Sequence, residues 1–148
     1  MASRRTEEME RKLTDALVQS AFATIGILTV LATEHDLSLT QLRVGGILRD
    51  RRVRMNELAS YLRVEKSTIT GLVDRAEKRG LMARAPNVDD GRATDVFLTK
   101  EGLRLAVRVE SELEGAMAPL VARLSVVDRR KLRELLERLL DGPEGSNT

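Results

Sequence analysis

Short hydroxyl side chains and one cation stand close together in a single segment of the chain. The segment reads Lys66, Ser67, Thr68, Ile69 and Thr70. Hydroxyl groups can donate and accept hydrogen bonds at the edges of DNA bases, and an ammonium group pairs with phosphate oxygens. These residue types therefore indicate non-covalent recognition of nucleic acid, provided that a helix presents them on one exposed face.

The rest of the composition offers these hydroxyls no catalytic partner. The chain of 148 residues has one His and no Cys, which excludes disulfides, thiolate metal ligands and thiol redox sensing. We find no pairing of a nucleophile with a base, no glycine-rich phosphate loop and no spacing of metal ligands. We therefore expect a protein that is not an enzyme and that holds neither a metal nor a cofactor.

A helix-turn-helix is the element that would position residues 66–70. Two short helices are predicted, over about 55–62 and 66–79, and Gly80 is typical of a helix end. Ala59 is the small residue that a tight helix crossing needs, and apolar residues fill the required offsets around it: Leu58, Leu62, Val64, Ile69 and Leu72. Arg63 stands where the turn usually has a glycine. The alternative is two amphipathic helices that match these offsets by chance.

A β-hairpin is predicted directly after the second of these helices. Extended runs at 81–85 and 94–98 flank a segment rich in Pro, Asn, Asp and Gly. Arg92 lies at the tip of this hairpin and can enter a narrow minor groove, where the negative potential is strongest. The alternative for Arg92 is a solvated loop charge, or an ion pair with Asp89 or Asp90 that holds the turn.

Longer amphipathic helices surround this central part. Apolar residues recur at helical spacing over 6–34, and Ser38 with Gln41 forms a capping box before a helix over about 39–50. Gly45 and Gly46 within that helix suggest close packing against a neighbour, and residues 51–54 are expected to form a basic connector. Further helices are predicted over 99–124 and from 125 onward, with Ser125 and Asp128 at the start of the second.

These elements define a mainly α fold with a small β-wing, in which dimerisation helices flank a winged helix-turn-helix core. We treat residues 1–148 as one chain with a helical dimerisation region at 6–37 and 99–141 and a DNA-binding region at 39–98. A core of this size cannot cover the apolar faces of three peripheral helices, so we expect a homodimer. The alternative is a monomer in which these helices fold back as a bundle.

Two segments resemble the MarR-type winged-helix regulators. Residues 90–99, from Asp90-Gly91-Arg92 to Leu98-Thr99, are similar to the wing signature of that family, and residues 67–81 are similar to its recognition helix and the exit from it. Ala76 stands where the family usually has a larger apolar residue. The resemblance covers nearly the whole chain and implies a homodimer that regulates transcription, with repression favoured over activation.

The resemblance also suggests roles for individual residues. Ser67, Thr68 and Thr70 would contact base edges and phosphates, with Lys66 on a phosphate. Arg75 resembles the arginine that braces the wing, paired with Asp90, although a plain surface charge is the alternative. Arg84 matches a basic position on the first wing strand that would touch phosphate. The cluster of Arg49, Arg51, Arg52 and Arg54 is either a second backbone contact or a solvated face.

Family members typically sense small aromatic or phenolic effectors in a cleft between the dimerisation helices and the winged core. In this chain the resemblance would place Phe22, Ile25, Thr29, His35 and Arg43 around that cleft. His35 is the single histidine, and the alternative for it is an ordinary residue at a helix end. A dimer would hold two recognition helices about one DNA turn apart, so the expected partner is a pseudo-palindromic double-stranded operator.

Composition, including the absence of Cys, is compatible with an intracellular protein. The net charge is +2, and hydrophobic and charged residues make up 42% and 32% of the chain, which is typical of a soluble globular protein. The run 22–32 is apolar but too short and too amphipathic to span a bilayer, and no apolar signal segment opens the chain. We therefore expect a cytoplasmic protein with no membrane partner. The functional alternative is a winged helix used for protein contacts or as a scaffold.

Overall fold

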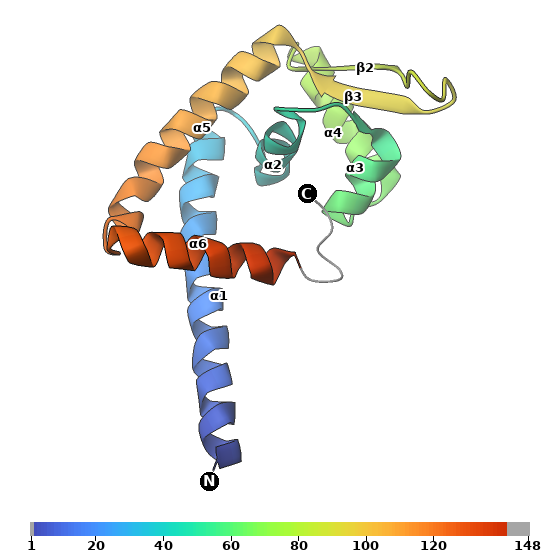
Figure 1. Cartoon of the computed structure of the whole chain (residues 1–148). Helices are drawn as coiled ribbons and strands as arrows, with labels where there is room; N and C mark the ends of the chain where they lie inside the picture. Colours follow the sequence, from blue (N-terminus) through green and yellow to red (C-terminus); the bar gives the residue numbers. More distant parts are fainter. Residues whose placement is uncertain (1, 142–148) are drawn as a thin grey trace.

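The computed structural model describes residues 2–141, with side chains from residue 4 onward. Helices frame a small sheet in the order α1 (Ala2–Glu34), α2 (Leu39–Leu48), β1 (Val53–Arg54), α3 (Met55–Leu62), α4 (Lys66–Lys78), β2 (Met82–Pro86), β3 (Thr94–Leu98), α5 (Lys100–Val121) and α6 (Val126–Leu140). Figure 1 shows α1 extending far beyond the rest of the fold, while the β2–β3 hairpin projects at the other end. This order confirms the mainly helical winged fold.

The sheet has three strands, one more than the sequence predicts. Its order is β1-β3-β2, and both pairings are antiparallel. Residues 51–54 were expected to be a connector, but Val53 pairs with Val96 and Arg54 with Asp95. The short strand therefore fixes the entry to α3 against the wing, and it places Arg54 beside the hairpin.

The core of the fold lies inside the winged unit. Leu58, Ala59, Ile69 and Leu72 are buried in one cluster with residues from α2, β1, β2 and β3, and Leu62 and Val64 pack against it from partly buried positions. All five apolar offsets around Ala59 therefore point inward, as the helix-turn-helix pattern predicts. The opposite face of α4 is left for solvent.

The turn between α3 and α4 has the usual geometry despite its unusual residue. Arg63 adopts the left-handed conformation, with φ 52° and ψ 45°, and its backbone N–H donates to Ala59 and Ser60. This is the conformation that glycine adopts without a steric penalty. The chain keeps the turn by accepting strain at Arg63 rather than by changing the path of the backbone.

Replacing Arg63 with glycine should therefore stabilise the protein. A left-handed conformation costs an ordinary residue roughly 1–2 kcal/mol in the folded state. Glycine avoids this cost, but it loses about 0.5–1 kcal/mol more in backbone entropy on folding, which offsets part of the gain. We expect Arg63→Gly to raise the free energy of unfolding by about 0.5 kcal/mol, as measured by chemical denaturation at matched protein concentration. A clear loss of stability would show that the Arg63 side chain makes a contact that outweighs the strain.

Helix α2 begins where the sequence predicts, but its glycines serve no close contact. Ser38 Oγ accepts from the Gln41 backbone N–H, and Gln41 Oε1 accepts from the Ser38 N–H, which completes the capping box. A Cβ on Gly45 or on Gly46 would meet no atom within 4 Å. The expectation of close packing at these glycines is wrong within the chain. Both of them line open space instead.

The outer helices carry large exposed apolar surfaces. Leu31 and Ala32 are buried where α1 packs on α2 and α5, but Leu13, Phe22 and Val30 are exposed. None of the residues of α6 is buried, and Leu132, Leu135, Leu136, Leu139 and Leu140 are 40–67% exposed. These faces have no partner among the residues that the structure describes.

The apolar part of α1 is longer than the predicted apolar run 22–32. Residues 4–34 are long and apolar enough to cross a membrane by length and composition, with a mean hydropathy of 1.8 in the most apolar window. The apolar run 22–32 that the sequence predicts is only part of this longer apolar stretch. Only 11% of that window is buried within the described structure, although the end of α1 packs into the fold. Helix α1 therefore presents a broad apolar face that another helix could cover.

Candidate nucleic-acid interface

The start of α4 presents its hydroxyl groups to solvent. Lys66, Ser67 and Thr68 are exposed, whereas Ile69 is fully buried on the opposite side of the helix. Among the described residues, the hydroxyls of Ser67 and Thr68 have no hydrogen-bond partner. The Thr70 hydroxyl already donates to the Lys66 carbonyl, with 2.9 Å between the oxygens. Of the three hydroxyls in this segment, those of Ser67 and Thr68 are therefore free to bind a ligand.

A hollow of about 240 Å³ lies between α3, α4 and the wing. It brings together four of the predicted DNA-binding residues, Lys66, Thr70, Arg84 and Arg92. It also includes Arg54, which sequence reasoning left undecided within a larger arginine cluster. The signal that could have found Arg54 is the pairing of residues 53–54 with β3, because this pairing turns one arginine of the cluster toward the wing.

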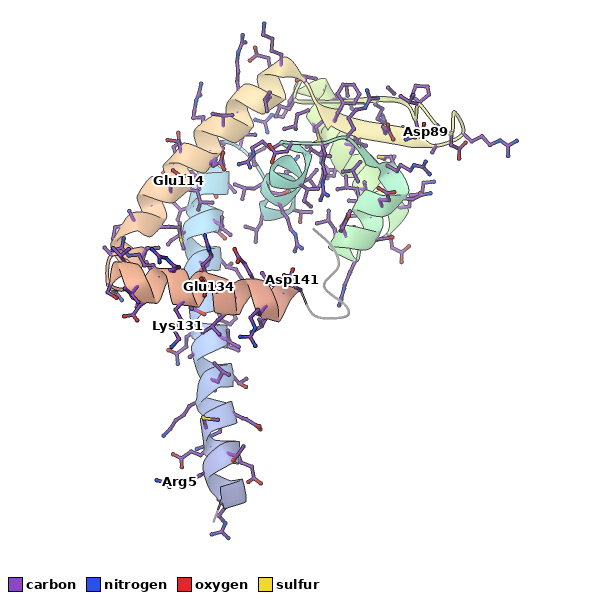
Figure 2. The ribbon with its side chains drawn as sticks, in the orientation of Figure 1. Arg5, Asp89, Glu114, Lys131, Glu134 and Asp141 are labelled. Atoms are coloured by element: carbon purple, nitrogen blue, oxygen red, sulfur yellow. The ribbon has the colours of Figure 1, made fainter. Side chains whose placement is uncertain are left out.

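The wing turn is organised by one amide side chain. Asn87 Oδ1 accepts from the backbone N–H groups of Asp89 and Asp90, at 3.0 Å each, and from Arg54 Nη2 at 3.3 Å. Asn87 Nδ2 donates to the buried carboxylate of Asp95 at 2.9 Å. Figure 2 shows Asp89 at the outer end of the hairpin. The turn is therefore held by Asn87, and not by an ion pair of Arg92.

Arg92 projects from the wing, and its guanidinium pairs with no acidic side chain among the described residues. Asp90 Oδ1 accepts from the Arg92 backbone N–H at 3.1 Å, and the Arg92 side chain forms no ion pair with any residue from 4 to 141. The expected pairing of Arg75 with Asp90 is absent: Arg75 is exposed, without an ion pair among these residues, and its Nη1 lies near Gly71. The Asp90 carboxylate accepts a hydrogen bond from the Arg92 backbone N–H within the turn instead of pairing with Arg75.

Arg84, on β2, is neutralised by two acidic residues of α4. Its Nη2 lies 2.6 Å from Asp74 Oδ1 and 2.6 Å from Glu77 Oε2. Hydrogen bonds first to Glu77 and then to Asp74 raise the pKa of the guanidinium above its ordinary value. Arg84 thus ties β2 to α4, and its charge is less available to phosphate than the sequence analysis expected.

The other arginines of the 49–54 cluster are also engaged. Arg51 lies over the ring of Tyr61 at 5.4 Å, and Arg52 lies over the ring of Phe97 at 4.5 Å and 3.6 Å from Asp95. Arg49 pairs with Asp50 and with Glu110 of α5, and the hydrogen bond from Arg49 lowers the pKa of Asp50. These contacts connect α2, the sheet and α5, so most of this cluster has a structural role.

A larger cavity of about 630 Å³ opens between α1, α2, α5 and the winged core. Ile25 and Arg43 line it, as do Gly45, Gly46 and Ala76, whose small side chains leave it wide. The other three residues predicted for a cleft do not line it. Phe22 is 70% exposed, the Thr29 hydroxyl donates to the Ile25 carbonyl, and His35 Nε2 lies 2.6 Å from Glu112 Oε2 of α5.

Arg43 is the one lining cation of this cavity without a partner among the described residues. It is exposed, whereas Arg49 is engaged with Asp50 and Glu110. Within the same part of the chain, no group of three potential metal ligands comes together. The cavity is therefore an apolar space with one free positive charge at its wall.

Comparison with known proteins identifies this arrangement. Residues 37–94 match the sequence model of the MarR family. The homoprotocatechuate degradative operon repressor of Escherichia coli is 29% identical over 133 residues, which cover 89% of this chain and 90% of the repressor. The winged part of the chain, residues 37–94, is therefore a MarR-family domain. As in that family, its fold is a winged-helix fold of transcription regulators.

Solved structures of the MarR fold agree with the whole arrangement. The transcriptional regulator PA4135 matches with a TM-score of 0.73 and 27% identity, over 86% of this chain and 94% of that regulator. A mutant of MarR from E. coli, crystallised with operator DNA, matches with a TM-score of 0.71 and 22% identity, over 87% and 94% of the two chains. These likenesses show the fold: α4 is the second helix of the helix-turn-helix, and β2–β3 is the hairpin that follows it.

Proposed function

We propose that this chain is a homodimeric transcriptional repressor that binds a pseudo-palindromic operator and is released by a small aromatic effector. The observation that carries the proposal is the start of α4, where the free hydroxyls of Ser67 and Thr68 stand beside Lys66 on the exposed face. Arg92, which pairs with no acid among residues 4–141, extends the same surface along the wing. These groups suit base edges, phosphates and a minor groove, in that order.

The helices outside residues 39–98 supply the dimer. We assign residues 6–37 and 99–141 to a dimerisation layer because their exposed apolar side chains on α1, α5 and α6 need a cover. A second copy offers the same faces, and a two-fold axis would set the two recognition helices about 34–36 Å apart. Because its partner is chromosomal DNA, we place the protein in the cytoplasm.

The larger cavity is the proposed effector site. A volume of about 630 Å³ suits a small organic molecule, and the free guanidinium of Arg43 would pair with a carboxylate or phenolate. The similar E. coli repressor is named for an operon that degrades homoprotocatechuate, an aromatic acid. An aromatic or phenolic acid is therefore the effector class that we expect for this chain.

Contacts around the cavity offer a route from effector to DNA. Ala76 and Leu81 line the cavity at the end of the recognition helix. Arg79, at the end of α4 between these two residues, donates to the backbone carbonyls of Asp36 at 2.7 Å and His35 at 3.1 Å, in the turn after α1. A ligand that moves α1 relative to the core would therefore move α4, and with it the spacing of the two helices in the dimer.

Arg43 provides the test of this effector class. We expect Arg43→Gln to weaken the release of operator DNA by aromatic acids about tenfold, because a charge-assisted hydrogen bond to the carboxylate is lost. Release is measured as the acid concentration that halves DNA binding in fluorescence anisotropy. Arg104→Gln, an equal loss of charge at an exposed position of α5, is the control. Equal responses of both variants to the acids would contradict a role for Arg43.

In vitro selection from a random duplex library tests the function as a whole. Purified protein should enrich a palindrome with half-sites about one turn apart, and affinity for it should fall steeply as the salt concentration rises. If no sequence is enriched and binding stays weak at low salt, the winged helix serves protein contacts or a scaffold instead.

A further inference from the structure

The hollow between α3, α4 and the wing has an unusual balance of charge. Four cations line it, Arg54, Lys66, Arg84 and Arg92, and its lining includes no acid. Arg84 is already paired with Asp74 and Glu77. Arg54, Lys66 and Arg92 form no ion pair with any described residue. Three uncompensated positive charges therefore converge on a space of about 240 Å³.

The backbone at the wall of the hollow adds hydrogen-bond donors that also favour a negatively charged ligand. Met55 and Asn56, the first residues of α3, line it. The first amides of a helix have no partner within the helix, and the residue that precedes α3, Arg54, makes no side-chain cap. Amides at a helix start favour anions. The cations and the amides thus point to one ligand chemistry, an oxyanion.

Arg54 is also held in place more firmly than an ordinary surface arginine. It is half-buried, it pairs through its backbone with β3, and its Nη2 donates to Asn87 Oδ1. Asn87 is oriented in turn by the buried carboxylate of Asp95. The same amide oxygen holds the wing turn that precedes Arg92. One side chain therefore sets the positions of two of the three free cations.

We propose that this hollow seats one backbone phosphate of the DNA in each half-site, held by Arg54 and Lys66, while Arg92 extends from the edge of the hollow toward the minor groove. The proposal rests on the proposed function, because it assumes bound DNA. It adds Arg54 to the interface and assigns two cations to a single phosphate rather than to separate points along the backbone. It also assigns Arg84 to the wall of the seat, where it maintains the distance between β2 and α4.

A scan with neutral phosphates tests the seat. Operator duplexes carrying one methylphosphonate at a time remove a single negative charge from the backbone. With the wild-type protein, one position in each half-site should lower the affinity about tenfold, since several charge-assisted hydrogen bonds are lost there. Arg54→Gln keeps an amide that can donate to Asn87 but removes the charge, so it should lower affinity for the unmodified operator by a similar factor.

The combination of the two changes decides the outcome. If Arg54 acts on that phosphate, the methylphosphonate costs Arg54→Gln little more, and the two losses are far from additive. The salt dependence of binding should also fall by about one phosphate contact per half-site. Lys66→Gln should behave in the same way, and Arg104→Gln should show additive losses at every position. Thermal unfolding of each variant verifies that it is folded.

Three results would overturn the proposal, and they differ in what else they overturn. If the wild-type protein binds its operator but no position shows non-additive losses with Arg54→Gln or Lys66→Gln, the seat is wrong and the function stands. If the wild-type protein binds no duplex in a salt-dependent way, the proposed function fails and the seat fails with it. Inorganic phosphate should compete with DNA no better than chloride at equal ionic strength. Specific competition below millimolar phosphate would assign the hollow to a free anion.

Discussion

Replacing Ser67 and Thr68 together with alanine is expected to lower the affinity for the operator about 100- to 1000-fold. Each hydroxyl lost from a base or phosphate contact costs about 1 kcal/mol, and a dimer loses both hydroxyls in each of two half-sites. The folded state should be unchanged, because both side chains are exposed and neither hydroxyl has a partner in the described structure. Fluorescence anisotropy with the selected duplex measures the loss.

The comparison with unrelated DNA makes this prediction specific. Affinity for a scrambled duplex should change less than about threefold, because phosphate charges dominate non-specific binding. Ser111→Ala on α5, another exposed serine, serves as the control and should bind the operator like the wild type. If the double variant kept the wild-type preference for the operator over the scrambled duplex, the start of α4 would not read the sequence.

Gly102→Ala should destabilise the protein by about 3 kcal/mol or more. A Cβ at this position would lie 1.9 Å from the Leu81 carbonyl oxygen and 2.9 Å from its carbon. The obstacle is backbone, so it cannot rotate away as a side chain would, and overpacking of this kind typically costs about 1–3 kcal/mol even where neighbours can shift. The same carbonyl accepts from the Thr99 N–H at the start of α5. The measurement is chemical unfolding at matched protein concentration.

The same helix provides a matched control. Gly115 is also within α5, and a Cβ there would meet nothing within 4 Å. Gly115→Ala should therefore stabilise the helix by about 1 kcal/mol through propensity alone. If Gly102→Ala were as stable as Gly115→Ala, α5 would not rest on the Leu81 peptide. The angle between the dimer layer and the winged core would then need another explanation.

The helix-turn-helix could be predicted because its information is local. The offsets of Leu58, Ile69 and Leu72 from Ala59 follow directly from two helices crossing over a short turn, and the structure buries all of these residues. The caps at Ser38, Thr99 and Ser125 are equally local, since each side chain accepts from an amide three residues later. Patterns of this range determine most of the element boundaries.

Features that depend on distant pairing could not be predicted in this way. β1 has two residues within a basic run, and its partner on β3 lies about forty residues away. The neutralisation of Arg84 requires knowing that β2 lies alongside α4. The cavity exists partly because Gly45, Gly46 and Ala76 lack bulk, and an absent side chain gives no periodic signal. The orientation of His35 toward α5 instead of the cavity is likewise a matter of tertiary packing.

We expect the dimer to place two recognition helices on two half-sites of one operator. The most direct test of this placement is operator affinity after insertion of base pairs between the half-sites. An insertion of about 5 base pairs, half a helical turn, moves one half-site to the opposite face of the DNA, so we expect the affinity to fall at least about 100-fold, toward the value for a single half-site. Unchanged affinity after this insertion would contradict the account, because it would mean that each chain binds DNA independently of a fixed dimer.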